Sequence, residues 1–150
     1  MPLRSAFLLA TTVLTGCMVG QKVSSFSPAR GAQGVRVDIQ KGMGSWISGA
    51  ELLAIQDTAL LVLRVHRRPV SQERVAWADQ QVVLVPLRII QTARFAQMGI
   101  STLVEDGRFR SMSGREQVRL VSRYPQGVGP ELLSALLAAY GQPQLEVLTK

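Results

Sequence analysis

Residues 59–65 have the sequence Ala-Leu-Leu-Val-Leu-Arg-Val, and this short run decides the fold. Alternate side chains of a β-strand point to opposite faces. One face of the run carries Leu61, Leu63 and Val65, and the other carries Leu60 and Val62. Because both faces are apolar, we expect both sides of this strand to be covered by other parts of the protein.

A second apolar run lies downstream, at residues 82–90. One face carries Val83, Val85, Leu87 and Ile89, and the other carries Val82, Leu84 and Ile90 together with Arg88. The pattern predicts one long strand. Pro86 interrupts it, and because proline cannot donate a ladder hydrogen bond, this position marks a sheet edge or a bend.

Two further strands are predicted upstream. Apolar and polar residues alternate over residues 35–40, which indicates a half-buried strand. Lys41-Gly42-Met43-Gly44 follows as a turn, and residues 46–56 form the next strand, with Gly49 at a bulge or sharp bend. Asp57-Thr58 supplies the turn into residues 59–65.

Helix signals appear in the last third of the chain. Residues 97–112 are turn-rich around Glu105-Asp106-Gly107 and predict a mobile loop or a weak hairpin. Ser113 and Glu116 have the spacing of a capping box and predict the start of a helix that ends at Pro125-Gln126-Gly127. A second helix begins at Gly129-Pro130-Glu131 and is stopped by Gly141.

The second helix carries one broad apolar stripe, made of Leu132, Leu133, Leu136, Leu137 and Tyr140. This stripe either covers the doubly apolar strands or forms a docking surface for a partner or a membrane. We favour the first interpretation, because those strands need a cover and the polar face of the helix lacks lysine and arginine. Leu145, Val147 and Leu148 suggest a short final strand.

The predicted class is therefore α+β: a small, strongly bent antiparallel β-barrel of four to five strands, covered by two short C-terminal helices. The order of strands and turns over residues 35–95 resembles SH3-like and Sm-like barrels. The resemblance implies a barrel but not RNA binding, because no asparagine follows Asp57 and Arg88 is followed by Ile89 in place of glycine. We expect no nucleic-acid partner.

Leu14-Thr15-Gly16-Cys17 follows a positive residue, Arg4, and a short apolar run at residues 5–14. That run is far shorter than the roughly 20 residues needed to cross a bilayer. The stretch resembles the lipobox of bacterial lipoproteins. The resemblance implies cleavage before Cys17, a thioether diacylglycerol and an N-acyl group on this cysteine, and no other cofactor.

These features divide the chain into a signal peptide at 1–16, a lipidated cysteine and flexible tether at 17–33, and one domain at 34–150. Met18 follows the cysteine, and by the sorting convention of the family an exported lipoprotein without aspartate here goes to the periplasmic face of the outer membrane. The alternative is an ordinary secretory signal, which leaves Cys17 as a free thiol.

Residues with catalytic potential are few. His66 is the single histidine, so a Cys/His metal site or a serine-histidine-acid triad would depend on it. We predict no metal site and no enzyme.

The chain is basic, with a net charge of +7. Two groups of arginines are candidate contacts for anionic ligands. The first group is Arg64, Arg67, Arg68 and Arg74, and the second is Arg108, Arg110, Arg115, Arg119 and Arg123. The alternative is that these arginines are ordinary solvated side chains.

The sequence thus predicts an envelope lipoprotein that acts as a non-catalytic binding or assembly module. Its partners would be the membrane, through the lipid, and an envelope protein or an anionic envelope polymer. Trp46 and Trp77 are candidates for a glycan-binding surface or for the core. The alternatives are an envelope enzyme with an unrecognised pair of carboxylates and, further off, an Sm-like nucleic-acid binder.

The lipid anchor is tested by Cys17→Ser. Because serine cannot form the thioether, we expect uncleaved precursor and loss of labelling by a radioactive or clickable fatty acid, with wild-type protein as the positive control. Continued palmitate labelling of the serine variant would show that Cys17 is not the anchored residue.

Overall fold

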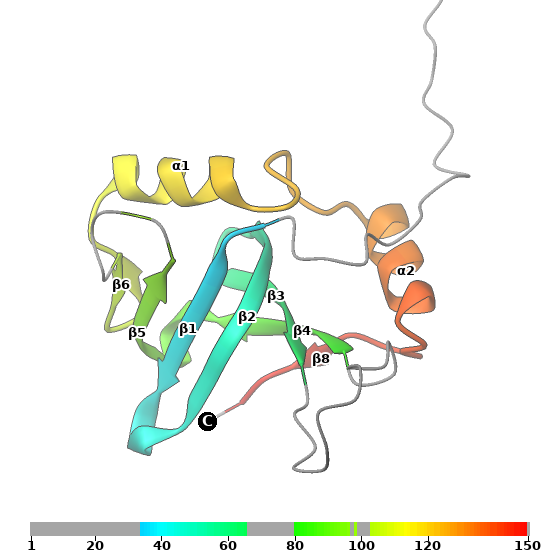
Figure 1. Ribbon diagram of the computed structural model, residues 1–150, viewed down its shortest axis with the longest axis horizontal. Coiled ribbons are helices and arrows are strands. Elements are labelled where there is room, and N and C mark those ends of the chain that lie inside the picture. The colour runs from blue at the N-terminus through cyan, green and yellow to red at the C-terminus, as the bar shows by residue number, and fades with distance from the viewer. Residues whose placement is uncertain (1–33, 66–79, 97, 99–102, 150) are drawn as a thin grey trace, which may run out of the picture.

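The structure is a computed structural model that describes residues 34–65, 80–96, 98 and 103–149. Within these residues, eight strands form one sheet and two α-helices pack on it (Figure 1). The predicted α+β class is confirmed. The hydrogen bonds among the described residues leave the sheet open, with β7 and β8 as its edges, so they do not show a closed barrel.

The sheet has the order β7-β6-β5-β1-β2-β3-β4-β8. All neighbours are antiparallel except β4 and β8, which are parallel. The strands are β1 Arg36–Lys41, β2 Trp46–Ile55, β3 Ala59–Val65, β4 Gln80–Pro86, β5 Ile90–Phe95, β6 Val104–Glu105, β7 Arg108–Phe109 and β8 Glu146–Val147. Short 3-10 helices lie at η2 Gly42–Gly44 and η4 Leu87–Ile89, and the α-helices are α1 Met112–Val121 and α2 Pro130–Ala139.

The first two strands match their prediction closely, including the bulge at Gly49. Val37 pairs with Ala50 but Ile39 pairs with Ile47, so the register shifts between these two pairs. Gly49 has a φ of +64°, which favours glycine, and its N–H donates to Asp38 Oδ1 at 2.6 Å. The extra residue bends β2 where the sheet curves.

The prediction of one long strand at residues 82–90 is wrong for its second half. The strand ends at Pro86, η4 turns the chain, and β5 begins at Ile90 and pairs with β1. Leu87 N–H donates to Thr58 O at 2.8 Å, outside the ladder of β3 and β4. Pro86 therefore marks a bend, as expected, and the bend separates two strands.

Two apolar clusters lie on opposite faces of the sheet, as the doubly apolar β3 predicts. Leu60 and Val62 belong to the larger cluster, which α1 joins through Val118. Leu61 and Leu63 belong to the second cluster. Val65, by contrast, is exposed at the end of the strand.

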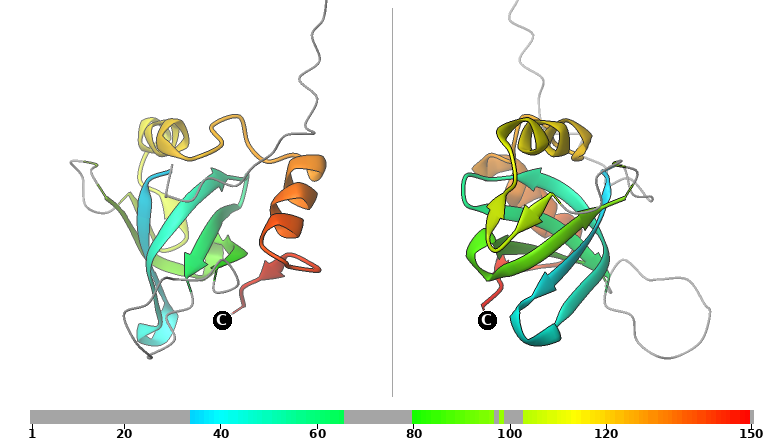
Figure 2. Two further views of the ribbon diagram at one scale, coloured as in Figure 1. Left: turned by 45° about the vertical axis from the view of Figure 1, so that its right-hand side comes forward. Right: turned by 90° about the vertical axis from the view of Figure 1, so that its left-hand side faces the viewer.

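Helix α2 covers the second cluster. Leu136 is fully buried there and Tyr140 is almost fully buried, while Leu132, Leu133 and Leu137 pack around them. Figure 2 shows α2 beside β3 and β4, whereas α1 lies across the end of the sheet where β1 begins. The prediction that the leucine stripe covers the sheet is confirmed.

The start of α1 differs from the predicted capping box. The N-cap is Ser111, whose extended backbone lets its hydroxyl accept a hydrogen bond from Gly114 N–H at 3.0 Å. Ser113 lies inside the first turn, and Glu116 binds Arg119 instead of closing a box. The helix also ends earlier than predicted, at Val121.

The remaining elements follow the sequence signals. The turn-rich segment contains a small hairpin of β6 and β7, joined at Asp106-Gly107. Gly129 is the N-cap of α2, and Gly141 has a φ of +66° just after the helix. Because β8 follows α2, the helices are late in the chain but do not end it.

We predict that Leu136→Ala lowers the free energy of unfolding by about 2–5 kcal/mol, because it removes buried apolar surface and leaves a cavity. Leu120→Ala is the matched control, since Leu120 is 63% exposed on α1. Its effect should stay within about 0.5 kcal/mol. Urea unfolding of both variants, followed by circular dichroism, makes the comparison. A wild-type midpoint for Leu136→Ala would contradict the packing of α2.

Candidate functional site

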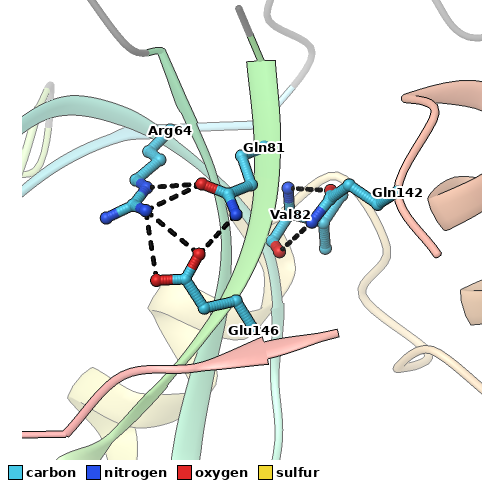
Figure 3. Close-up of polar contacts among 5 residues, drawn as sticks. All are labelled: Arg64, Gln81, Val82, Gln142 and Glu146. Carbon is cyan, nitrogen blue, oxygen red and sulfur yellow. Dashed lines mark hydrogen bonds and ion pairs between the residues drawn. The ribbon is translucent and has the colours of Figure 1, made fainter. Parts of the chain in front are cut away.

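Arg64 is the one member of the first predicted arginine group within the described residues. Its Nε and Nη2 donate to Gln81 Oε1 at 3.1 and 2.7 Å (Figure 3). The Nη2 also donates to the Glu146 carboxylate, 3.1 Å from Oε2, and Gln81 Nε2 donates to the same oxygen. Arg64 therefore ties β3, β4 and β8 together. His66, Arg67, Arg68, Arg74 and Trp77 lie outside the described residues.

Beside this network, Gln142 completes the edge of β4. Its side-chain amide accepts a hydrogen bond from Val82 N–H at 2.5 Å and donates one to Val82 O at 3.1 Å (Figure 3). The amide group thus replaces one residue of a neighbouring strand, and Leu148 N–H continues the pairing at Leu84 O. The edge of β4 is covered here, so this stretch cannot accept an added strand.

The second predicted arginine group separates into different environments. Three members have acidic partners: Arg110 with Glu105, Arg119 with Glu116, and Arg115 with Asp57 at a longer distance of 4.0 Å. Arg108 is exposed and has no ion pair among the described residues. The fifth member is buried, which corrects the expectation of one exposed basic group.

That buried member is Arg123. Its side chain is 3% exposed and that of its partner Glu51 is 7% exposed, with 3.6 Å between Nη1 and Oε2. Glu51 Oε1 also accepts a hydrogen bond from Gly34 N–H at 2.8 Å. Sequence analysis missed this pair, although one signal was present: Glu51 is the only charged residue within β2.

The buried pair lies where the described chain begins. Val35 N–H donates to Val121 O, and Leu52 N–H donates to Val35 O. A Cβ on Gly34 would lie 2.2 Å from Leu52 O, so only glycine fits between β2 and the segment after α1. Burial raises the pKa of the neighbouring Tyr124 phenol above its ordinary value. The contacts of Gly34 and Val35 therefore hold the start of the described domain against β2 and the end of α1.

One half of the outer sheet surface is not covered by α2. We call it the outer polar face, and it consists of Arg36, Asp38, Gln40, Trp46, Thr92, Arg94, Glu105 and Arg108. Paired residues share a face, and the pairs run continuously across five strands: Trp46 with Gln40, Gln40 with Thr92, Thr92 with Glu105, and Glu105 with Arg108. The adjacent row contains Asp38 and Arg94.

Charge and exposure make this face a candidate binding surface. Trp46 is 46% exposed, so this tryptophan is not a core residue. Within the described chain, Arg36, Arg94 and Arg108 are exposed and make no ion pair. The two acids of the face are engaged, Glu105 by Arg110 and Asp38 by Gly49 N–H. Cationic and aromatic groups together suit an anionic polymer.

A pocket of about 650 Å³ lies at the tip of the β1–β2 hairpin, and we call it the tip pocket. It is formed where the hairpin tip, η4 and the β6–β7 turn come together. Its lining residues are Lys41, Gly42, Ser45, Arg88, Ile89, Ile90, Gln91 and Asp106. None of them belongs to the outer polar face, and sequence analysis did not group them.

The described residues bring together no group of three or more histidine, cysteine, aspartate or glutamate side chains that could hold a metal ion. Across the same residues, neither helix is long and apolar enough to cross a membrane. No family model, curated protein or solved structure matches the chain. The lipobox, the lipid anchor and the SH3-like or Sm-like resemblance therefore stay predictions.

The Glu51–Arg123 pair is tested by Glu51→Gln. Gln can still accept from Gly34, but it leaves Arg123 buried without a counter-charge, so we expect a loss of about 3–5 kcal/mol in unfolding free energy. Glu105→Gln, which breaks the exposed pair with Arg110, should cost no more than about 1 kcal/mol. Equal denaturation midpoints for the two variants would contradict a structural role for the buried pair.

Proposed function

We propose that this protein is a lipid-anchored lipoprotein of the bacterial cell envelope that binds an anionic envelope polymer without catalysing a reaction. The observation that carries the proposal is the outer polar face, which combines Trp46 with three exposed arginines that make no ion pair among the described residues. Anchoring through Cys17, at the periplasmic face of the outer membrane, follows from the lipobox resemblance.

The geometry of the β1–β2 hairpin supports this arrangement. β1 starts beside α1, where Gly34 is held, and its far end carries the hairpin tip (Figure 1). A strand rises about 3.3 Å per residue, so the six residues of β1 place that tip about 20 Å from the start of the domain. The outer polar face extends along this direction, from Arg36 near the start of the domain to Gln40 and Trp46 near the tip.

The order of the central strands supports the finer fold assignment. β5-β1-β2-β3-β4 form a continuous antiparallel series, and η4 separates β4 from β5. On this basis we propose that the core is a bent SH3-like or Sm-like barrel. Because the residues at the expected RNA-contact positions differ, an anionic polymer of the envelope is the preferred ligand over nucleic acid.

Binding should depend on the three arginines of the outer polar face that make no ion pair among the described residues. We predict that combined Arg36→Gln, Arg94→Gln and Arg108→Gln weaken binding of the full-length protein to isolated peptidoglycan or lipopolysaccharide more than about tenfold, since each exposed arginine contributes about 1 kcal/mol near an anionic surface. Co-sedimentation and surface plasmon resonance at two salt concentrations provide the measurement.

The control is the triple variant Arg64→Gln, Arg115→Gln and Arg119→Gln, which removes the same charge from arginines that lie off the outer polar face and have acidic partners. It should bind within about threefold of wild type, because these guanidinium groups already face carboxylates. Equal losses in both triple variants would mean that only net charge matters. Tighter binding to single-stranded DNA at physiological salt would instead favour the nucleic-acid alternative.

A further inference from the structure

The tip pocket has walls that are fixed by backbone contacts. Asp106 and Gly107 have φ values of +47° and +78° and form the two-residue turn between β6 and β7. Asp106 N–H donates to Gln91 O and Gly107 N–H donates to Ile90 O, both at 2.9 Å. The turn is therefore held against the start of β5.

The backbone of η4 also lies close to Gly107. A Cβ at this position would lie 3.1 Å from Leu87 O and 3.2 Å from Arg88 Cα, so the turn packs directly on η4. Ile89 and Ile90, at the base of the pocket, are almost fully buried in the larger apolar cluster. The pocket thus has a rigid framework, which lowers the entropic cost of binding a ligand.

Three charged side chains line this framework. Lys41 and Arg88 are cationic and Asp106 is anionic, and none of the three makes an ion pair among the described residues. Ser45 and Gln91 add a hydroxyl and an amide to the lining. The pocket therefore offers several donors for an anion and one anionic group for a cation.

We propose that the tip pocket binds a small phosphate monoester that also carries an amine. Lysine and arginine together match the charge of a phosphate monoester, about −1.5 to −2 at neutral pH. The Asp106 carboxylate matches a neighbouring ammonium group and repels a bare phosphate. The net charge of the three side chains, +1, complements a ligand that combines a dianionic phosphate with one ammonium. The volume is sufficient for a ligand of this size.

This proposal is independent of the lipid anchor and of the outer polar face, because the pocket shares no residue with that face. It therefore stands or fails separately from the proposed function. Full-length purified protein is titrated with phosphoethanolamine, inorganic phosphate, ethanolamine and glycine, and binding is measured by calorimetry and by NMR shifts of the Gly42 and Gly107 amides.

Wild-type protein should bind phosphoethanolamine more tightly than the other three probes. Lys41→Gln and Arg88→Gln should each weaken that binding by about tenfold or more, because each removes a charge-assisted contact. Arg94→Gln is the matched control, since it removes an exposed arginine of β5 that does not line the pocket, and it should leave phosphoethanolamine binding unchanged.

Asp106→Asn gives the sharpest test, because asparagine also tolerates the positive φ of this turn. It should weaken phosphoethanolamine binding and strengthen inorganic phosphate binding, since it removes both the ammonium partner and the repulsion. A change of the same sign for both ligands, preferential binding of glycine, or no shift at Gly42 and Gly107 with millimolar phosphoethanolamine would each overturn the proposal.

Discussion

The need to cover both faces of β3 constrains the rest of the structure. Leu60 and Val62 bury on one side and Leu61 and Leu63 on the other, so no single apolar layer can satisfy this strand. The bent sheet and α1 enclose the first side, and α2 encloses the second. The two helices are thus placed by the apolar pattern of a strand that lies far from them in sequence.

The same constraint explains which surface is left open. α2 is only ten residues long, and its apolar stripe covers the part of the sheet where the outer residues are leucine, alanine and valine. Over β1, β5, β6 and β7 the corresponding positions are polar, and hydration of these side chains removes the need for a cover. The outer polar face is therefore the polar continuation of the face that α2 buries.

Long-range polar contacts hold the ends of the chain to this framework. Glu146 reaches Arg64 across 82 positions of sequence, and Gln142 reaches Val82 across 60. At the other end, Gly34 is held by Glu51, which in turn faces Arg123. The start and the finish of the described domain are therefore both fixed on the sheet.

The sequence by itself determined the elements whose signals are local. Alternation of apolar and polar residues predicted β1, and the run that is apolar on both faces predicted β3. Gly49 marked the bulge, and the helical spacing of leucines predicted α2 and its buried side. Only the tertiary structure decided the division at Pro86, the burial of Arg123 and the grouping of Lys41, Arg88 and Asp106. The physical reason is that these features depend on which distant segments pair, whereas periodicity reports only which side of one segment is apolar.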